Sequence, residues 1–393
     1  MDAPQRPELW RARLATSAMF LLFGIALGAW TARIPAVKRD LDLTDGLLSV
    51  ALLSFALGAI IGMQLAGRLV DRLGSARILL PAAAVEGVGL VLPGFAPGLL
   101  ALAAGLLLFG IVHGALNIAM NANAVEVQRA WGRPIITSFH AVYSVGGFLG
   151  AAIGGLFAAG DVSARATFLW VAAGITVVAL AAGRGVLRSA PVPVAPTVEG
   201  RPSGVVLLGV LAFCCLVGEG AAADWSTVYL RDDLGSSAGF AAAAYAAFAV
   251  AMTAGRLVGD RLAARFGHIQ LVRASAALAA AGLAAALAVG HPIAGVLGFG
   301  CLGAGLACIA PQVFSAAGDR DPARAGQAIA RVAAMGYAGF LVGPVVIGAA
   351  AEITGLRWAL IVPVLLTVFV AVAATALRPS APRTTAVSPS RAG

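Results

Sequence analysis

The sequence contains few charged residues. Only 11% of its 393 residues are charged and 60% are hydrophobic, whereas about a quarter of the residues in an average soluble domain are charged. So small a charged fraction excludes a soluble globular domain. It predicts an integral membrane protein.

The sequence also lacks the motifs of several functional classes. It has no His-Glu-x-x-His metal pair and no Walker-type phosphate loop, which leaves an embedded metalloenzyme and an ATP-driven pump without support. Its four cysteines lie in apolar segments without the spacing of a zinc site, and we expect them to pack as small apolar residues. They are Cys214, Cys215, Cys301 and Cys308. We therefore expect no enzymatic activity, no metal and no cofactor.

Long apolar runs dominate the chain instead. About 20 apolar residues are needed to cross a hydrocarbon layer of ~30 Å as a helix, whereas barrel strands are about ten residues long and alternate in polarity. The sequence predicts an all-α membrane protein with twelve transmembrane helices. The predicted spans are residues 14–35, 46–69, 78–95, 99–124, 135–158, 165–187, 204–230, 238–258, 270–289, 293–316, 327–350 and 358–377.

The formal charge of +9 is explained by topology and does not indicate nucleic-acid binding. If the N-terminus is cytoplasmic, 21 of the 27 basic residues lie in inner segments, as the positive-inside rule requires. We expect a multi-pass protein of the bacterial inner membrane with both termini in the cytoplasm. We also expect a monomer.

The chain carries an internal repeat. The segment GRLVDRLG, at Gly67–Gly74, closes the second span, and GRLVGDRL, at Gly255–Leu262, closes the eighth. Duplicated membrane units of this kind build transporters. We expect two six-helix bundles, residues 1–187 and 204–377, joined by a proline-rich cytoplasmic linker at 188–203. The polar tail, residues 378–393, is expected to be disordered.

The repeated segment resembles a motif of the major facilitator superfamily, Gly-x-x-x-Asp-Arg-x-Gly followed by a basic residue, between helices 2 and 3. The matching residues are Gly67, Asp71, Arg72, Gly74 and Arg77, with a looser second copy at Gly255, Asp260 and Arg261. The resemblance covers essentially the whole chain and implies two pseudo-symmetric six-helix bundles. GAWTARIPAVKRDL, NIAMNANAVEV and SFHAVYSVGGFLG are similar to the branch that contains fucose permease and MosC, which implies a small polar, sugar-like or polyol-like substrate.

The motif residues are candidates for a gate. The resemblance implies that Asp71 approaches the N-terminus of helix 11 near Gln327 and that Asp260 does the same for helix 5. The helix dipole favours an anion there. Such contacts would exist only while the inner side is closed, and they would favour the outward-open state. The alternative is that the motif only holds loops in the cytoplasm through its arginines.

Polar residues in helices 4 and 5 are candidates for substrate binding. His113, Asn117 and Asn121 follow one another at intervals of four and share one helix face. The resemblance implies that helices 1, 4, 7 and 10 line a central cavity; the alternative is hydrogen bonding between helices. His140 and Tyr143 in helix 5 suit hydroxyl recognition or a pH-sensitive step, although a buried histidine can also be structural. Two further candidates are Trp30 in helix 1 and Gln312 in helix 10.

Three acidic residues lie inside predicted spans, where acids are costly and usually functional. We expect Glu219 to take up a proton during transport, with a fixed structural partner as the alternative. Asp224 is expected near the extracellular mouth, paired with Arg33, and Glu86 is equally consistent with structural pairing and with coupling. Fucose permease uses an aspartate in helix 1 and a glutamate in helix 4. The best-matching positions here hold Thr31 and Asn117, so its proton route does not transfer.

The sequence therefore predicts a secondary active transporter that moves a small polar solute by alternating access, in symport with protons. The first alternative is a proton-coupled efflux antiporter. Such antiporters often carry a glycine-rich Gly-Pro motif in helix 5, and here the match lies in helix 11, at Gly339, Gly343, Pro344 and Gly348. A receptor without transport activity is a further alternative, but no loop is large enough to signal.

Overall fold

The computed structural model describes residues 6–43, 45–188, 204–320 and 322–378, and it is helical throughout, with no strand in these residues. Eleven of the described helical segments are long and apolar enough to cross a membrane, and α8 occupies the place of the remaining predicted span. All twelve predicted spans are thus helical. The predicted linker and tail fall almost entirely on residues 189–203 and 379–393, outside the described residues.

The helices follow the predicted order. The first half of the chain contains α1 (Arg6–Asp40), α2 (Asp45–Leu73), α3 (Ser75–Val91), α4 (Leu99–Trp131), α5 (Ile136–Ala159) and α6 (Ala164–Gly183). The second half contains α7 (Val205–Val228), α8 (Ala238–Phe266), α9 (His268–Val289), α10 (Pro292–Leu306), α11 (Ile309–Arg320), α12 (Ala325–Thr354), α13 (Leu356–Ala359) and α14 (Ile361–Ala373). Short helical segments are η1 (Leu92–Phe95), η2 (Tyr229–Asp233), η3 (Pro322–Arg324) and η4 (Ala374–Leu377).

Two predicted spans are interrupted by proline. The tenth span divides at Ala307, between α10 and α11, and the twelfth divides at Leu360, between α13 and α14. Pro311 lacks the N–H that would bond to the carbonyl of Ala307, and Pro363 lacks the one that would bond to Ala359. Hydropathy does not register this loss, so the sequence predicted two continuous helices.

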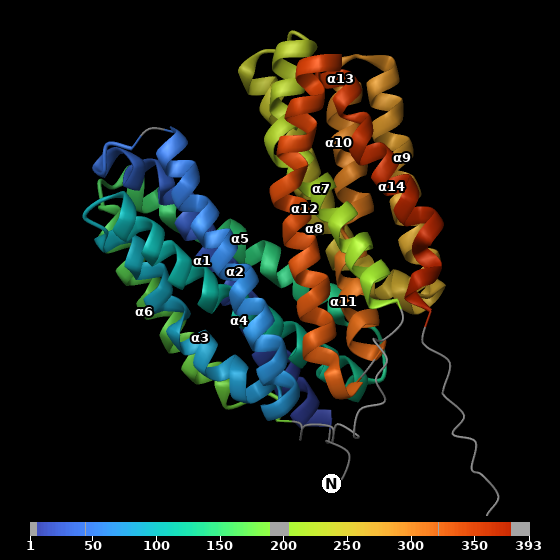
Figure 1. Ribbon diagram of the computed structural model, residues 1–393. Coiled ribbons are helices and arrows are strands. Elements are labelled where there is room, and N and C mark those ends of the chain that lie inside the picture. The colour runs from blue at the N-terminus through green and yellow to red at the C-terminus, as the bar shows by residue number, and fades with distance from the viewer. Residues whose placement is uncertain (1–5, 44, 189–203, 321, 379–393) are drawn as a thin grey trace, which may run out of the picture.

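The two halves lie side by side and touch at one end. In Figure 1, α1–α6 and α7–α14 come together at the lower end, where α1 begins, and diverge toward the upper end. The turn between α2 and α3 and the turn between α8 and α9 lie at the end where the halves meet. We call this the arginine-rich end, because each of these turns is flanked by several arginines that are predicted to be cytoplasmic.

Glycines bring helices of the first half into backbone contact. A Cβ added to Gly28 of α1 would lie 2.1 Å from the carbonyl oxygen of Gly147 in α5, and one added to Gly150 would lie 2.2 Å from that of Ile25. Gly110 of α4 approaches the carbonyl of Phe55 in α2 in the same way, at 2.1 Å. Lipid supplies no hydrophobic force between helices, so close packing through small residues holds them together.

This packing gives a matched pair of substitutions in one helix. Gly150→Ala places a methyl group against the backbone of α1, and we expect it to lower the stability of the protein by about 1–3 kcal/mol. Gly155→Ala is the control, because a Cβ at Gly155 meets no atom within 4 Å; it should be neutral or slightly stabilising, since alanine favours a helix. Thermal unfolding of both purified variants in detergent tests this. Equal unfolding temperatures would show that the α1–α5 contact is looser than described.

Candidate functional site

Asp71 connects the two halves at the arginine-rich end. Its Oδ1 accepts a hydrogen bond from the N–H of Gly326 at 2.7 Å, and its Oδ2 accepts from the N–H of Gln327 at 3.1 Å and from Nε2 of Gln327 at 2.8 Å. Both N–H groups belong to the first turn of α12, where they have no partner within the helix. The contact that the sequence predicts near Gln327 is therefore present.

Asp260 makes the same contact in the opposite direction. It projects from α8 of the second half, and its Oδ1 and Oδ2 accept hydrogen bonds from the N–H groups of Thr137 at 2.8 Å and Ser138 at 2.9 Å. These N–H groups lie in the first turn of α5, in the first half. Each half thus places a carboxylate on a helix N-terminus of the other, where the helix dipole attracts negative charge.

The glycines of the two motif copies have different surroundings. A Cβ on Gly67 would lie 2.7 Å from Cβ of Ala330, so glycine lets α2 approach α12 of the opposite half. Gly74 begins α3 with φ of 89°, a conformation that favours glycine. Gly255, in contrast, packs against Ala307 of its own half, with 2.7 Å between the two Cβ positions. The prediction that Gly255 is equivalent to Gly67 is wrong. Gly255 precedes its aspartate by five residues and Gly67 by four, so Gly255 lies on a different side of its helix relative to the aspartate.

The basic residues of the motif lie on the surface. Arg72, Arg77 and Arg261 are exposed, and among the described residues none of them hydrogen bonds to the opposite half. Arg77 donates only to the carbonyl of Leu73, at 3.3 Å. Their placement fits the alternative interpretation, in which arginines set the topology of the loops.

Three further side chains close the arginine-rich end, and sequence reasoning missed two of them. Gln128 of α4 donates from Nε2 to Oγ of Ser315 at 2.7 Å, and Arg129 donates from Nε to Oδ1 of Asp319 at 2.7 Å. The third is Gln312, predicted to bind substrate. It is fully buried, donates to Oγ1 of Thr137 at 3.0 Å and bonds to the His268 ring. The structure therefore places Gln312 among the contacts of the closed end.

Gln128 and Arg129 were missed because the predicted fourth span stops at residue 124. Polar residues continue the helix to Trp131, beyond the apolar run, and carry both side chains to the opposite half. Hydropathy detects the apolar part of a helix and not a polar extension of it.

A second polar contact between the halves lies one helical turn before Asp260. Arg256 of α8 donates from Nη1 to Oγ of Ser144 at 2.7 Å, and from Nη2 to Oε1 of Glu219 at 3.3 Å. Ser144 belongs to α5 in the first half, and Glu219 to α7 in the second. Arg256 is only 7% exposed. We name Ser144, Glu219 and Arg256 the central cluster.

The position of Arg256 corrects a prediction. Arg256 is one of the 21 basic residues that the sequence assigns to inner, cytoplasmic segments, although it falls inside the predicted span 238–258. A guanidinium at this depth needs a partner because burying an unpaired charge is costly. Glu219, an acid in the neighbouring helix, supplies it. The sequence contains a signal for this buried ion pair, namely an arginine within one predicted span and an acid within another.

Aromatic and titratable side chains surround the central cluster. Tyr143 of α5, Tyr245 of α8 and Tyr337 of α12 lie near Glu219. His140 lies near Arg256, and its ring contacts those of Phe20 and Phe314, with centroids 5.3 and 5.9 Å away. Of the predicted substrate-binding residues, His140 and Tyr143 are thus brought next to Glu219 and Arg256.

His113 faces a different neighbour from the one predicted. Its Nδ1 lies 2.6 Å from Oε1 of Glu86 in α3, and both side chains have no exposed surface. The Phe23 ring stacks on His113 at 3.7 Å between centroids and lies 5.5 Å from the Tyr143 ring, so it separates the pair from Tyr143. His113 is therefore not on a cavity wall, and Glu86 has a partner within its own half.

The remaining candidates are also held inside the first half. Asn121 is fully buried and donates from Nδ2 to the carbonyl oxygen of Asn117, at 2.9 Å. Trp30 is 2% exposed and lies against Phe168 of α6, with ring centroids 5.8 Å apart. The Trp30 contact is packing between two helices, whereas the Asn121 hydrogen bond lies within α4 itself.

The predicted pair of Asp224 and Arg33 is wrong. Arg33 is buried and donates from Nη2 to the carbonyl oxygen of Val162 at 2.6 Å, within its own half. Asp224 is exposed and makes no hydrogen bond to any described residue. Arg33 belongs to α1 and Asp224 to α7, and the halves that contain these helices diverge away from the arginine-rich end (Figure 1).

Comparisons with known proteins agree with this geometry. The sequence model of the Major Facilitator Superfamily matches residues 14–216 and 207–393. The uncharacterized transporter y4wD of Sinorhizobium fredii is 36% identical over 94% of this chain and 98% of its own length. Membrane protein MosC of Rhizobium meliloti is 33% identical over 91% of this chain and 88% of its own.

A solved structure has a similar fold. FucP, the E. coli fucose:proton symporter, was solved in an outward conformation that matches with a TM-score of 0.81 at 16% identity, covering 93% of this chain and 98% of FucP. At this identity the likeness concerns the fold alone.

The two aspartate contacts generate a prediction about conformation. Asp71→Asn leaves a neutral side chain in which one acceptor oxygen remains and the other is replaced by an NH2 group, which cannot accept a hydrogen bond from the first turn of α12. Hydrogen bonds to charged groups contribute about 1.5–3 kcal/mol, so we expect the population closed at the arginine-rich end to fall about tenfold or more relative to the open one. Spin labels attached through Arg39→Cys and Asp232→Cys, at the diverging ends of the two halves in a cysteine-free background, report this as a shift to shorter distances.

The control for this experiment is Asp161→Asn. Asp161 is exposed at the diverging end, so its substitution should leave the distance distribution unchanged. A distribution that is also unchanged by Asp71→Asn would refute the gate.

Proposed function

The chain belongs to the Major Facilitator Superfamily and is a membrane transporter; from that premise we propose that it carries a small polar solute, sugar-like or polyol-like, in symport with protons. The proposal rests on the central cluster, where one guanidinium binds an acid of its own half and a hydroxyl of the other. This is an arrangement in which a proton and the contact between the halves can affect each other.

We place the arginine-rich end in the cytoplasm of a bacterial cell, with the protein in the inner membrane. The distribution of basic residues supports this orientation. In this orientation the described conformation is outward-open, because the halves are closed at the cytoplasmic side and diverge on the other side (Figure 1). Asp71 and Asp260 then form the inner gate. Their hydrogen bonds to the opposite half are equivalent, and both sets must break when the solute is released into the cytoplasm.

Glu219 is the proposed proton acceptor. As a carboxylate it attracts Nη2 of Arg256 across 3.3 Å, while Nη1 of the same guanidinium donates to Ser144. Protonation removes the negative charge, and the ion pair then becomes a neutral contact. Arg256 loses the partner that fixes its orientation, which weakens its hold on Ser144 in the opposite half. Proton uptake from the open side would thereby favour separation of the two halves beside the gate.

The same side chains suit a hydroxyl-rich solute. Ser144 and Tyr143 can donate and accept hydrogen bonds, the His140 ring can do either at its Nε2, and Arg256 only donates. In the described residues His140 Nε2 is buried without a hydrogen-bond partner, so it can bind a hydroxyl group. A solute that bridges α5 and α8 would contact both halves, as alternating access requires. The name of FucP, a fucose:proton symporter, agrees with this substrate class.

Replacing the acid tests proton coupling. Glu219→Gln keeps the shape of the side chain but cannot exchange a proton, so gradient-driven accumulation of the solute in proteoliposomes should fall to the equilibrium level, while exchange without a gradient continues. Glu352→Gln, at an exposed acid of α12, is the control and should accumulate normally. Undiminished accumulation by Glu219→Gln would remove Glu219 from the mechanism. Reversing the imposed gradient separates symport from efflux by antiport.

A ligand screen tests the substrate class. A solute that binds the folded protein raises its unfolding temperature, by an amount set by concentration and affinity. We expect sugars or polyols to stabilise the purified protein and simple amines to have no effect. Tyr143→Phe should reduce this stabilisation and leave the unfolding temperature without ligand nearly unchanged. Ser144→Ala should reduce the stabilisation too, and it should also lower the unfolding temperature without ligand, because it removes the hydrogen bond from the buried guanidinium of Arg256. Stabilisation by amines alone would favour an efflux function.

A further inference from the structure

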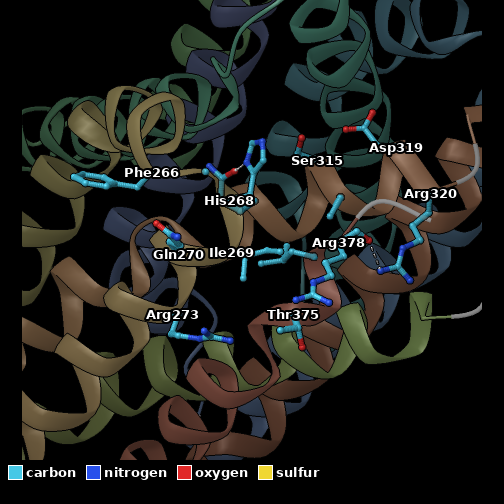
Figure 2. Close-up of a pocket in the computed structure, with 14 residues that line it drawn as sticks. Phe266, His268, Ile269, Gln270, Arg273, Ser315, Asp319, Arg320, Thr375 and Arg378 are labelled. Atoms are coloured by element: carbon cyan, nitrogen blue, oxygen red, sulfur yellow. Dashed lines mark hydrogen bonds between the residues drawn. The ribbon is translucent and has the colours of Figure 1, made fainter. Parts of the chain in front are cut away.

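A separate cavity lies at the arginine-rich end of the second half. Its volume is about 510 Å³, and its walls come from the start of α9, the end of α11 and the residues around η4. Figure 2 shows these segments around a common hollow, with His268, Ser315 and Arg320 on its walls. The central cluster does not contribute to the lining.

Three arginines line this cavity. Arg273 donates from Nε to the carbonyl oxygen of Ala371 at 3.3 Å. Arg320 donates to the carbonyl oxygens of Ala376 and Arg378, the second at 3.2 Å. The guanidinium of Arg378 makes no hydrogen bond to any described residue. Carbonyl groups orient the first two side chains but supply no negative charge.

No free carboxylate within the lining faces Arg273 or Arg378. Among the described residues that line the cavity one is acidic, Asp319, and its Oδ1 accepts from Nε of Arg129 at 2.7 Å. The guanidinium groups of Arg273 and Arg378 therefore produce a local positive potential at the hollow, which an anion would stabilise.

The start of α9 adds hydrogen-bond donors to the same hollow. Gly267 precedes the helix with φ of 79°, and no side chain caps the first turn. His268, Ile269 and Gln270, whose backbone N–H groups begin the helix, all line the cavity. The N–H groups of a first helical turn and the helix dipole together bind phosphate groups in many proteins.

We propose that this cavity binds a phosphate-bearing anion. The first turn of α9 supplies N–H donors, and Arg273 and Arg378 supply charged donors of a planar geometry that matches phosphate oxygens in pairs. Arg320 holds the end of the chain around η4 in place as one wall of the cavity, through its hydrogen bonds to the carbonyl oxygens of Ala376 and Arg378. The source is a soluble phosphate compound or the headgroup of an anionic phospholipid, which the arginines would meet at the membrane surface.

The cavity shares a wall with the closed end of the protein. Ser315 and Asp319 line it and also bond to Gln128 and Arg129 of the first half, and Gln312 bonds to Thr137. A bound anion therefore lies directly behind contacts that join the two halves.

The test compares two charge-matched double variants. Arg273→Gln/Arg378→Gln removes two guanidinium groups from the cavity. Arg184→Gln/Arg188→Gln removes two exposed guanidinium groups after α6, in the other half. Thermal unfolding of each protein is followed in detergent while inorganic phosphate replaces chloride at constant ionic strength, and in nanodiscs of phosphatidylcholine with and without phosphatidylglycerol.

We expect phosphate, phosphatidylglycerol or both to raise the unfolding temperature of the wild type and of the Arg184/Arg188 variant. The Arg273/Arg378 variant should bind roughly tenfold more weakly for each arginine removed. A response to phosphate alone identifies a soluble ligand, and a response to phosphatidylglycerol alone identifies a lipid headgroup. Both outcomes support the site.

The proposal is overturned if neither probe stabilises the wild type, or if both double variants respond equally. Should the Arg273/Arg378 variant unfold at a lower temperature without any probe, equilibrium dialysis of phosphate below that temperature measures binding directly. Full binding by the folded variant would then refute the site. None of these readouts depends on transport activity.

Discussion

The contact between a carboxylate and the first turn of a helix in the opposite half is the interaction on which the arrangement of this protein depends. Asp71 and Asp260 each satisfy two backbone N–H groups that their own helices leave without partners. An apolar pair could press the halves together in any register, whereas these carboxylates fix which turn meets which. The side chains of Gln128, Arg129 and Gln312 add to a register that the aspartates already define.

Two buried acids show how the same chemistry takes different roles in the two halves. Glu86 pairs with His113 inside the first half, with the Phe23 ring over it, and neither partner has any exposed surface. Glu219 pairs with Arg256, which also reaches Ser144 across the interface. A change of charge on Glu86 would alter the packing of one half. A change on Glu219 would alter the relation between the two, which is why we assign coupling to Glu219.

The number of spans could be predicted from the sequence because a run of apolar residues identifies a membrane helix by its length. The Asp71 contact joins residues 255 positions apart, so it could be predicted only through the resemblance of its motif to a known family. The neighbours of His113 and Gln312 could not be predicted in this way. Periodicity shows that His113, Asn117 and Asn121 share one face of a helix, but it does not show which helices pack against that face. In the structure His113 contacts Glu86 of α3 and Phe23 of α1. Arg256 was missed because counting basic residues by side of the membrane does not show which of them are buried against other helices.

The glycine contacts within the first half also bear on how this family can change over evolution. Gly28 and Gly150 join α1 and α5 through main-chain atoms, so a substitution can disturb that contact only by adding bulk. The contacts between the halves instead depend on individual side chains. A single substitution can strengthen, weaken or remove each of these contacts. Selection can therefore adjust the balance between conformations, and with it the speed and direction of transport, while the bundles that carry the binding residues stay intact.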